Sequence, residues 1–203
     1  MKEIAFETII CILSAALIMI IHELSKAAAY IFMRKRQQQS IVGSEHIWHV
    51  WRYIDPVGII LAVTCFVPVS KPHMFRIRDK LTNKVLGITG FAVLLILFIF
   101  SVFLLNTGNL GIGNIVAAGG ILGRFTSIFL QYTAILSFDM FIVNMFPIST
   151  FDMGLLIAGA SSGRYLQIIK ADSLIKLILL LTLMLDLIHF GCIKLLRVIL
   201  NFL

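Results

Sequence analysis

Apolar residues form long, nearly unbroken runs along this chain, and most polar residues fall in the segments between the runs. Four runs are longer than the ~20 residues that a helix needs to cross the hydrocarbon core of a bilayer. They cover residues 4–33, 84–105, 115–147 and 173–200. The pattern therefore predicts an all-α, polytopic membrane protein built as a bundle of four transmembrane helices.

A fifth apolar run, residues 54–69, is shorter than the ~17 residues of a minimal span. It opens with Asp55-Pro56-Val57-Gly58 and is flanked on both sides by basic residues. A crossing would put these two basic segments on opposite sides of the membrane, although Lys and Arg collect in cytoplasmic loops. We therefore expect a re-entrant or short segment, with the basic loops cytoplasmic and the N-terminus outside.

Composition supports this interpretation. Of the 203 residues, 60% are hydrophobic and 13% are charged, whereas soluble domains carry about 25% charged residues. We expect a single integral membrane domain over residues 1–203, with a C-terminal helix at about 173–203. The net charge is +7, and the basic residues responsible for it are expected to face the headgroups of a plasma membrane. Because no basic patch is interleaved with aromatic residues, the expected partner is the lipid bilayer and no nucleic acid.

A cluster of ionisable residues lies inside the first apolar run, at His22-Glu23-Leu-Ser-Lys26. Charges at membrane depth are costly and mark functional sites. His22 and Lys26 are four residues apart and share one helix face, with Glu23 at its edge. In H-E-x-x-H two histidines bind zinc and the glutamate is the general base, but here Lys26 stands at the second histidine position. The alternative is a polar spot at a span end, with Lys26 reaching the headgroups.

A second cluster ends the third long run, at Asn144, Pro147 and Asp152. Pro147 breaks the helix and leaves backbone groups unpaired for Asn144 or a ligand to bond. Asp152 follows this break, and Gly154 is expected to allow a tight turn. The alternative is an ordinary span end with Asp152 as a helix cap. Asp139, inside the same run, is expected to face the bundle interior as a structural or partner contact.

Together these motifs resemble the site-2 protease family of intramembrane zinc metalloproteases. That family pairs H-E-x-x-H on one transmembrane helix with N-x-x-P-x-P-x-L-D-G on a later one, and the second cluster falls on this pattern at matching spacing. Asp55-Pro56-Val57-Gly58 is similar to the D-P-x-G segment of the compact bacterial branch. The resemblance covers about residues 4–154 and implies a protease-like core there, in a multi-pass bacterial membrane protein.

The resemblance also implies roles for individual residues. His22 and Asp152 would be zinc ligands, Glu23 would activate a water, and Asn144 would steady the substrate or transition state. Structural roles are implied for Asp55, Pro56, Gly58 and Pro147. The chain departs from the branch where A-G-P-x-x-N is usual, since it has Leu86-Gly87-Ile88-Thr89-Gly90 instead.

The larger departure is Lys26. A catalytic zinc needs three protein ligands plus water, and an ammonium has donors but no lone pair. We therefore expect Lys26 to replace the metal electrostatically, pairing with Asp152 or Glu23. The leading hypothesis is a pseudoprotease without a cofactor, which binds a transmembrane segment or a membrane partner but does not cut it. Two alternatives stay open: an active intramembrane zinc metalloprotease with an altered ligand set, and a transport or resistance protein that uses the polar cavity.

Overall fold

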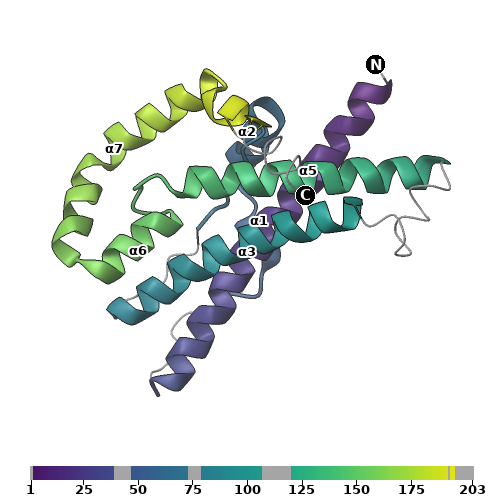
Figure 1. Cartoon of the computed structure of the whole chain (residues 1–203). Coiled ribbons are helices and arrows are strands. Elements are labelled where there is room, and N and C mark those ends of the chain that lie inside the picture. The colour runs from purple at the N-terminus through teal and green to yellow at the C-terminus, as the bar shows by residue number, and fades with distance from the viewer. Residues whose placement is uncertain (1, 39–46, 73–78, 107–119, 192, 195–203) are drawn as a thin grey trace.

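The computed structural model describes residues 2–38, 47–72, 79–106, 120–191 and 193–194 (Figure 1). The elements within them are α1 (Lys2–Arg36), the 3-10 helix η2 (Val50–Tyr53), α2 (Pro56–Cys65), α3 (Lys80–Asn106), α5 (Gly120–Asn144), α6 (Asp152–Ala160) and α7 (Ser162–Met184). Helices account for most of these residues, and none of them is in a β-strand. The prediction of an all-helical protein is confirmed.

Three helices of the described residues are long and apolar enough to cross a membrane: α1, α3 and α5. They correspond to the first three predicted spans. Each extends or shortens the predicted run by a few residues, because helix ends follow local hydrogen bonding and not the limits of an apolar run. The three helices cross one another at the centre of the molecule (Figure 1). Aromatic contacts join α3 to α5, with the rings of Phe91 and Phe141 5.3 Å apart.

The fourth predicted span, residues 173–200, is not among these three helices. The helix α7 begins earlier, at Ser162, and ends at Met184. The chain then turns at Leu185 and Asp186, where Asp186 adopts a left-handed φ of 51°. A left-handed residue ends an α-helix, so the apolar run does not continue as one rod. Its last part, residues 195–203, lies outside the described residues.

The short helix α2 begins at Asp55 and Pro56, and Gly58 lets it pack closely. The Asp55 carboxylate accepts a hydrogen bond from the Val57 N–H at 3.0 Å, which caps the helix. Pro56 occupies the first turn, where its missing N–H costs no hydrogen bond. A side chain at Gly58 would overlap the backbone carbonyl of Val69. Glycine therefore lets the returning chain lie against the start of this helix.

The two ends of the short apolar segment meet. With 10 residues, α2 is about 15 Å long, half the hydrocarbon thickness of a bilayer. The helix ends at Phe66, which has a left-handed φ of 56°. The Lys71 N–H then donates a 3.1 Å hydrogen bond to the carbonyl of Tyr53. The chain therefore returns close to the residues from which the segment departs.

After α5 and an irregular connection over residues 145–151, the chain forms the two helices α6 and α7. The helix α6 was missed in the sequence because it has only nine residues, mostly apolar and too few for a span. The prediction of a tight turn at Gly154 is wrong. This glycine lies inside α6, where a side chain would overlap the carbonyl of Ile148. Gly159 packs in the same way against Lys84 of α3, so α6 lies flat on α3.

Asp79 joins the end of α1 to the start of α3. One of its carboxylate oxygens accepts hydrogen bonds from the Thr82 N–H at 3.0 Å, the Thr82 hydroxyl at 2.8 Å and the Gln37 amide at 2.7 Å. Because these donors favour the charged form, the hydrogen bonds from Thr82, with that from Gln37, lower the pKa of Asp79 to about 2.

This shift predicts a pH-dependent contribution to stability. The folded-state pKa lies below the ordinary value of 3.8, so the contribution is complete above about pH 4 and is lost as the pH falls toward 2. Asp79→Asn should therefore lower the melting temperature near pH 7 and have little effect near pH 2. Melting curves of both proteins in detergent across this range would check the prediction. A difference that stays constant with pH would contradict it.

Candidate functional site

Four ionisable side chains from the two predicted clusters lie together between α1 and α6. His22, Glu23 and Lys26 come from the buried face of α1, and Asp152 is the first residue of α6. Their exposed fractions are 1%, 1%, 2% and 0%. Charges this deeply buried are stable only when they are paired and hydrogen-bonded, so the arrangement of their partners decides what the cluster can do.

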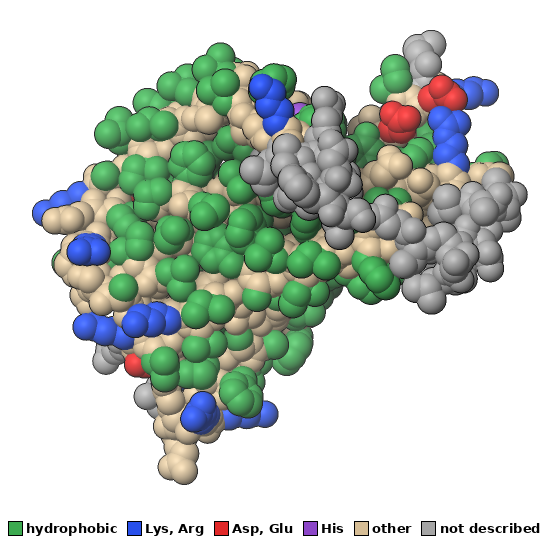
Figure 2. Space-filling model, in the orientation of Figure 1, with side chains coloured by type: hydrophobic (Ala, Val, Ile, Leu, Met, Phe, Trp, Pro, Cys, Tyr) green, Lys and Arg blue, Asp and Glu red, His purple; other side chains and the backbone are tan. Residues whose placement is uncertain are grey.

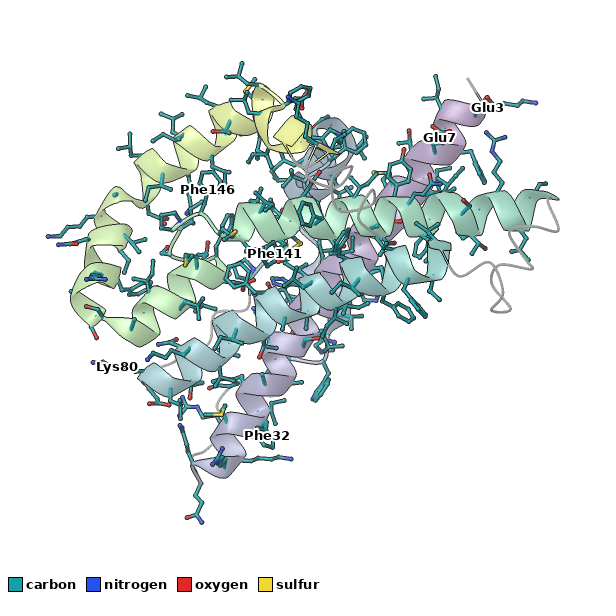
Figure 3. The ribbon with its side chains drawn as sticks, viewed as in Figure 1. Glu3, Glu7, Phe32, Lys80, Phe141 and Phe146 are labelled. Carbon is teal, nitrogen blue, oxygen red and sulfur yellow. The ribbon has the colours of Figure 1, made fainter. Side chains whose placement is uncertain are left out.

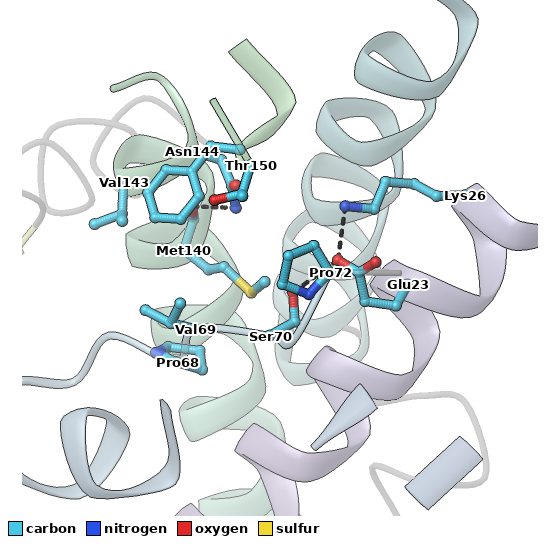
Figure 4. Close-up of a pocket in the computed structure, with 11 residues that line it drawn as sticks. Glu23, Lys26, Pro68, Val69, Ser70, Pro72, Met140, Val143, Asn144 and Thr150 are labelled. Atoms are coloured by element: carbon cyan, nitrogen blue, oxygen red, sulfur yellow. Dashed lines mark hydrogen bonds and ion pairs between the residues drawn. The ribbon is translucent and has the colours of Figure 1, made fainter. Parts of the chain in front are cut away.

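Lys26 is the centre of this cluster. Its ammonium lies 2.6 Å from a Glu23 oxygen and 3.1 Å from a carboxylate oxygen of Asp152. Figure 4 shows Lys26 extended toward Glu23. One cation therefore bridges two buried carboxylates, which lie on different helices. The contact ties α6 to α1 and offsets part of the cost of removing both anions from water.

His22 completes the charge balance. Its Nε2 lies 2.7 Å from the other carboxylate oxygen of Asp152. Its Nδ1 lies 3.2 Å from Glu23 and 3.4 Å from the Ser70 hydroxyl. Since Ser70 donates its own hydrogen to Glu23 at 2.8 Å, both ring nitrogens face acceptors. This geometry suits an imidazolium, which donates from both nitrogens. Two cations then face two anions, and the cluster is neutral overall.

Two residues of the site were missed by sequence reasoning. Ser70 reaches the cluster from the extended chain after α2, and a lone serine there carries no sequence signal. Gly90 of α3 forms the wall behind Asp152, since a Cβ added at Gly90 would overlap the Asp152 carboxylate. A Cβ at Gly87 would lie 2.7 Å from the Asp152 carbonyl oxygen. Small residues let helices approach closely, but the pair Gly87 and Gly90 carries no signal of which helix packs on it.

Asn144 lies beside this cluster, in the last turn of α5. Its amide donates to the carbonyl of Met140 in its own helix at 3.0 Å. It lines a narrow cavity with Glu23, Lys26 and residues of the chain that follows α2 (Figure 4). The cavity offers about 10 Å³ to the centre of a water molecule, which is room for one water. Pro147 lies in the connection between α5 and α6, after the helix has ended at Asn144.

The residues present do not fit a zinc ion in this arrangement. At the usual bond lengths, two zinc ligands in a tetrahedron stand about 3.3 Å apart, but His22 Nε2 and Asp152 Oδ2 are 2.7 Å apart and share a hydrogen bond. Both histidine nitrogens face acceptors, and Lys26 occupies the remaining side of Asp152. Among the described residues, no group of three or more His, Cys, Asp or Glu side chains is arranged to hold a metal ion.

Asp139 makes a separate contact, away from this cluster. It is fully buried in α5, and one of its oxygens lies 2.9 Å from Nδ1 of His189. The expectation that Asp139 faces the interior agrees with this burial. The chain reverses at Asp186 and brings His189, from the predicted C-terminal segment, back to α5.

The site is thus a buried, charge-balanced cluster that joins α1, α6 and the chain after α2 beside a cavity with room for one water. Its hydrogen bonds hold Glu23 between Lys26 and Ser70. Comparisons of the chain with protein-family models, with curated proteins and with solved structures found no match.

Proposed function

We propose that this chain is a multi-pass membrane pseudoprotease with a site-2 protease-like core, in which Lys26 takes the place of the zinc ion. The observation that carries the proposal is the contact of one Lys26 ammonium with both Glu23 and Asp152. In the active family these positions serve the metal and its water. A fixed cation on both carboxylates holds the two clusters together without a metal and leaves Glu23 paired.

A pseudoprotease of this kind acts by binding. Its ligand is a transmembrane segment of another protein, or a membrane partner, recognised without cleavage. The chain of residues 67–72 supports this role, since it is neither helix nor strand and borders the polar cavity beside Asn144 and Thr150. An unwound segment of a partner helix would find hydrogen-bonding groups along this chain, which lipid cannot supply.

The proposed orientation puts the basic end of the molecule in the cytoplasm. Figure 2 shows Lys and Arg side chains gathered along one edge, where α1 ends, α3 begins and α6 meets α7. The opposite end carries Glu3, which pairs with Arg124 at 3.2 Å. This distribution supports a plasma-membrane protein with its basic loops inside.

Metal content tests the proposal. Protein purified in detergent without chelators should hold far less than one zinc per chain, because two ligands bind zinc weakly. Lys26→His restores a third ligand and should raise the content toward one zinc per chain. Zinc should also raise the melting temperature of that variant alone. Elemental analysis and melting curves provide the two readouts.

The matched control is Lys176→His, which places a new histidine at an exposed lysine that pairs with Asp172. It should gain no tightly bound zinc. About one tightly bound zinc in the natural sequence would overturn the proposal and favour the active protease. So would cleavage of a transmembrane substrate that is abolished by Glu23→Gln in a folded protein.

A further inference from the structure

A second cavity lies apart from the α1–α6 cluster, between the first turns of α1, the end of α2, the middle of α5 and the segment after α7. Its lining residues are Glu7, Phe66, Ile128, Gln131, Tyr132, Ile135, His189 and Ile193. Its volume is about 290 Å³, near the lower limit of about 300 Å³ for small-molecule sites. His22 is 15 positions beyond Glu7 on α1, roughly 22 Å along the helix, so the two sites are separate.

Aromatic rings form one wall of this cavity. The rings of Phe66 and His189 stack with centroids 4.3 Å apart and planes 14° apart. Tyr132 lies nearly parallel to Phe66, with centroids 6.4 Å apart. The left-handed backbone at Phe66 ends α2 and holds its ring at this point. Stacked ring faces attract a cation through their negative π-surfaces and an apolar body through contact area.

The described polar residues of the lining are Glu7, Gln131, Tyr132 and His189, each of which can accept a hydrogen bond. Nδ1 of His189 lies 2.9 Å from the buried Asp139 carboxylate, and a neutral ring that donates from Nδ1 keeps Nε2 as an acceptor. Glu7 adds a partly buried carboxylate (Figure 3). Glu7 is thus the carboxylate of the described lining, and Asp139 lies behind His189.

Two cations on the neighbouring turns, Arg124 and Lys194, have interaction partners. Arg124 pairs with Glu3 at 3.2 Å, one turn before Glu7 on α1. The Lys194 ammonium lies 4.4 Å from the centroid of the Phe190 ring. Among the described residues that line the cavity, none is a lysine or arginine. The described lining therefore offers acceptors, ring faces and apolar side chains, and no basic residue that would receive an anion.

We propose that this cavity binds a small organic ammonium ion with an apolar or aromatic body. The ammonium pairs with Glu7 and with Nε2 of His189, while the body packs between Tyr132, Phe66 and the isoleucines. A neutral apolar ligand would leave the Glu7 carboxylate desolvated without a partner, which is costly. The ammonium can belong to a free amine or to the headgroup of an ethanolamine lipid, since both present the same group.

Phenethylammonium is a suitable probe, and the neutral 2-phenylethanol is its matched control ligand. Binding is measured by saturation-transfer NMR on the full chain in a maltoside detergent, which carries no ammonium. We expect phenethylammonium to bind and 2-phenylethanol to bind at least about tenfold more weakly, because the alcohol loses a charge-assisted hydrogen bond. Glu7→Gln should weaken phenethylammonium binding by a similar factor, and Tyr132→Leu by about threefold or more.

Glu3→Gln is the matched control variant, since it makes the same change one turn away on α1 and outside the cavity lining. It should bind the probe as the natural sequence does. Displacement of the probe by phosphatidylethanolamine, but not by phosphatidylglycerol, assigns the ammonium to a lipid headgroup, and no displacement assigns it to a free amine. The proposal is overturned if phenethylammonium does not bind, if 2-phenylethanol binds equally well, or if Glu7→Gln and Glu3→Gln have the same effect.

Discussion

Replacing Lys26 by methionine should lower the free energy of unfolding by about 3–5 kcal/mol, the loss measured when one partner of a buried ion pair is removed. Methionine keeps the length of the side chain but not its charge. The carboxylates of Glu23 and Asp152 would then face each other across α1 and α6 without the ammonium that now lies 2.6 Å and 3.1 Å from them. Denaturant unfolding in detergent micelles measures this loss.

The matched control for this substitution is Lys176→Met. Lys176 also pairs with an aspartate, Asp172, at 2.6 Å, but its side chain is 52% exposed. Exposed pairs of this kind contribute about 0–1 kcal/mol, so the control should change stability little. Adding Asp152→Asn to Lys26→Met should recover part of the loss, because it removes one of the uncompensated anions. A loss below about 1 kcal/mol in Lys26→Met would show that the ammonium does not stabilise the cluster.

Gly90→Ala is expected to be nearly as damaging, with a loss of about 3 kcal/mol, at the upper end for overpacking a buried site. The new methyl group would occupy the space of the Asp152 carboxylate. Either α6 moves away from α3, or the carboxylate leaves His22 and Lys26. Both responses break the contacts of a fully buried charge, so the effect exceeds that of a steric change alone.

Gly163→Ala provides the comparison for this substitution. Gly163 lies in the first turn of α7, where an added Cβ would come no closer than 4.0 Å to its nearest neighbour, the Ser161 hydroxyl. Alanine favours a helix over glycine by up to about 1 kcal/mol, so this variant should be neutral or more stable. If Gly90→Ala unfolds like Gly163→Ala under the same denaturant, then α3 does not hold Asp152 in place.

Much of the fold could be read from hydrophobic pattern. The spans that became α1, α3 and α5 were predictable because they are long and apolar enough to cross a bilayer, which helices of soluble proteins are not. The short segment at α2 could also be read, since Asp55 and Pro56 begin a helix by local chemistry. The helix α6 was not predictable, because a mostly apolar stretch of nine residues suits a strand, a loop or a short helix equally well.

The C-terminal region shows where pattern reading fails. A largely apolar run over residues 173–200 suggested one helix, but the chain turns at Asp186 and returns His189 to Asp139. This turn is favoured by a contact between residues 50 positions apart. Hydropathy averaged along the chain contains no information about such a contact.

The candidate site likewise has features that the sequence determines and features that only the folded structure determines. The sequence alone shows which residues carry charge. It also shows that His22 and Lys26 share a helix face, because spacing along one helix is a local property. Whether the ammonium would meet one carboxylate or both depended on how α6 packs on α3. The glycines at positions 87 and 90 set that approach, and a distance between helices is a property of the folded chain that no short stretch of sequence encodes.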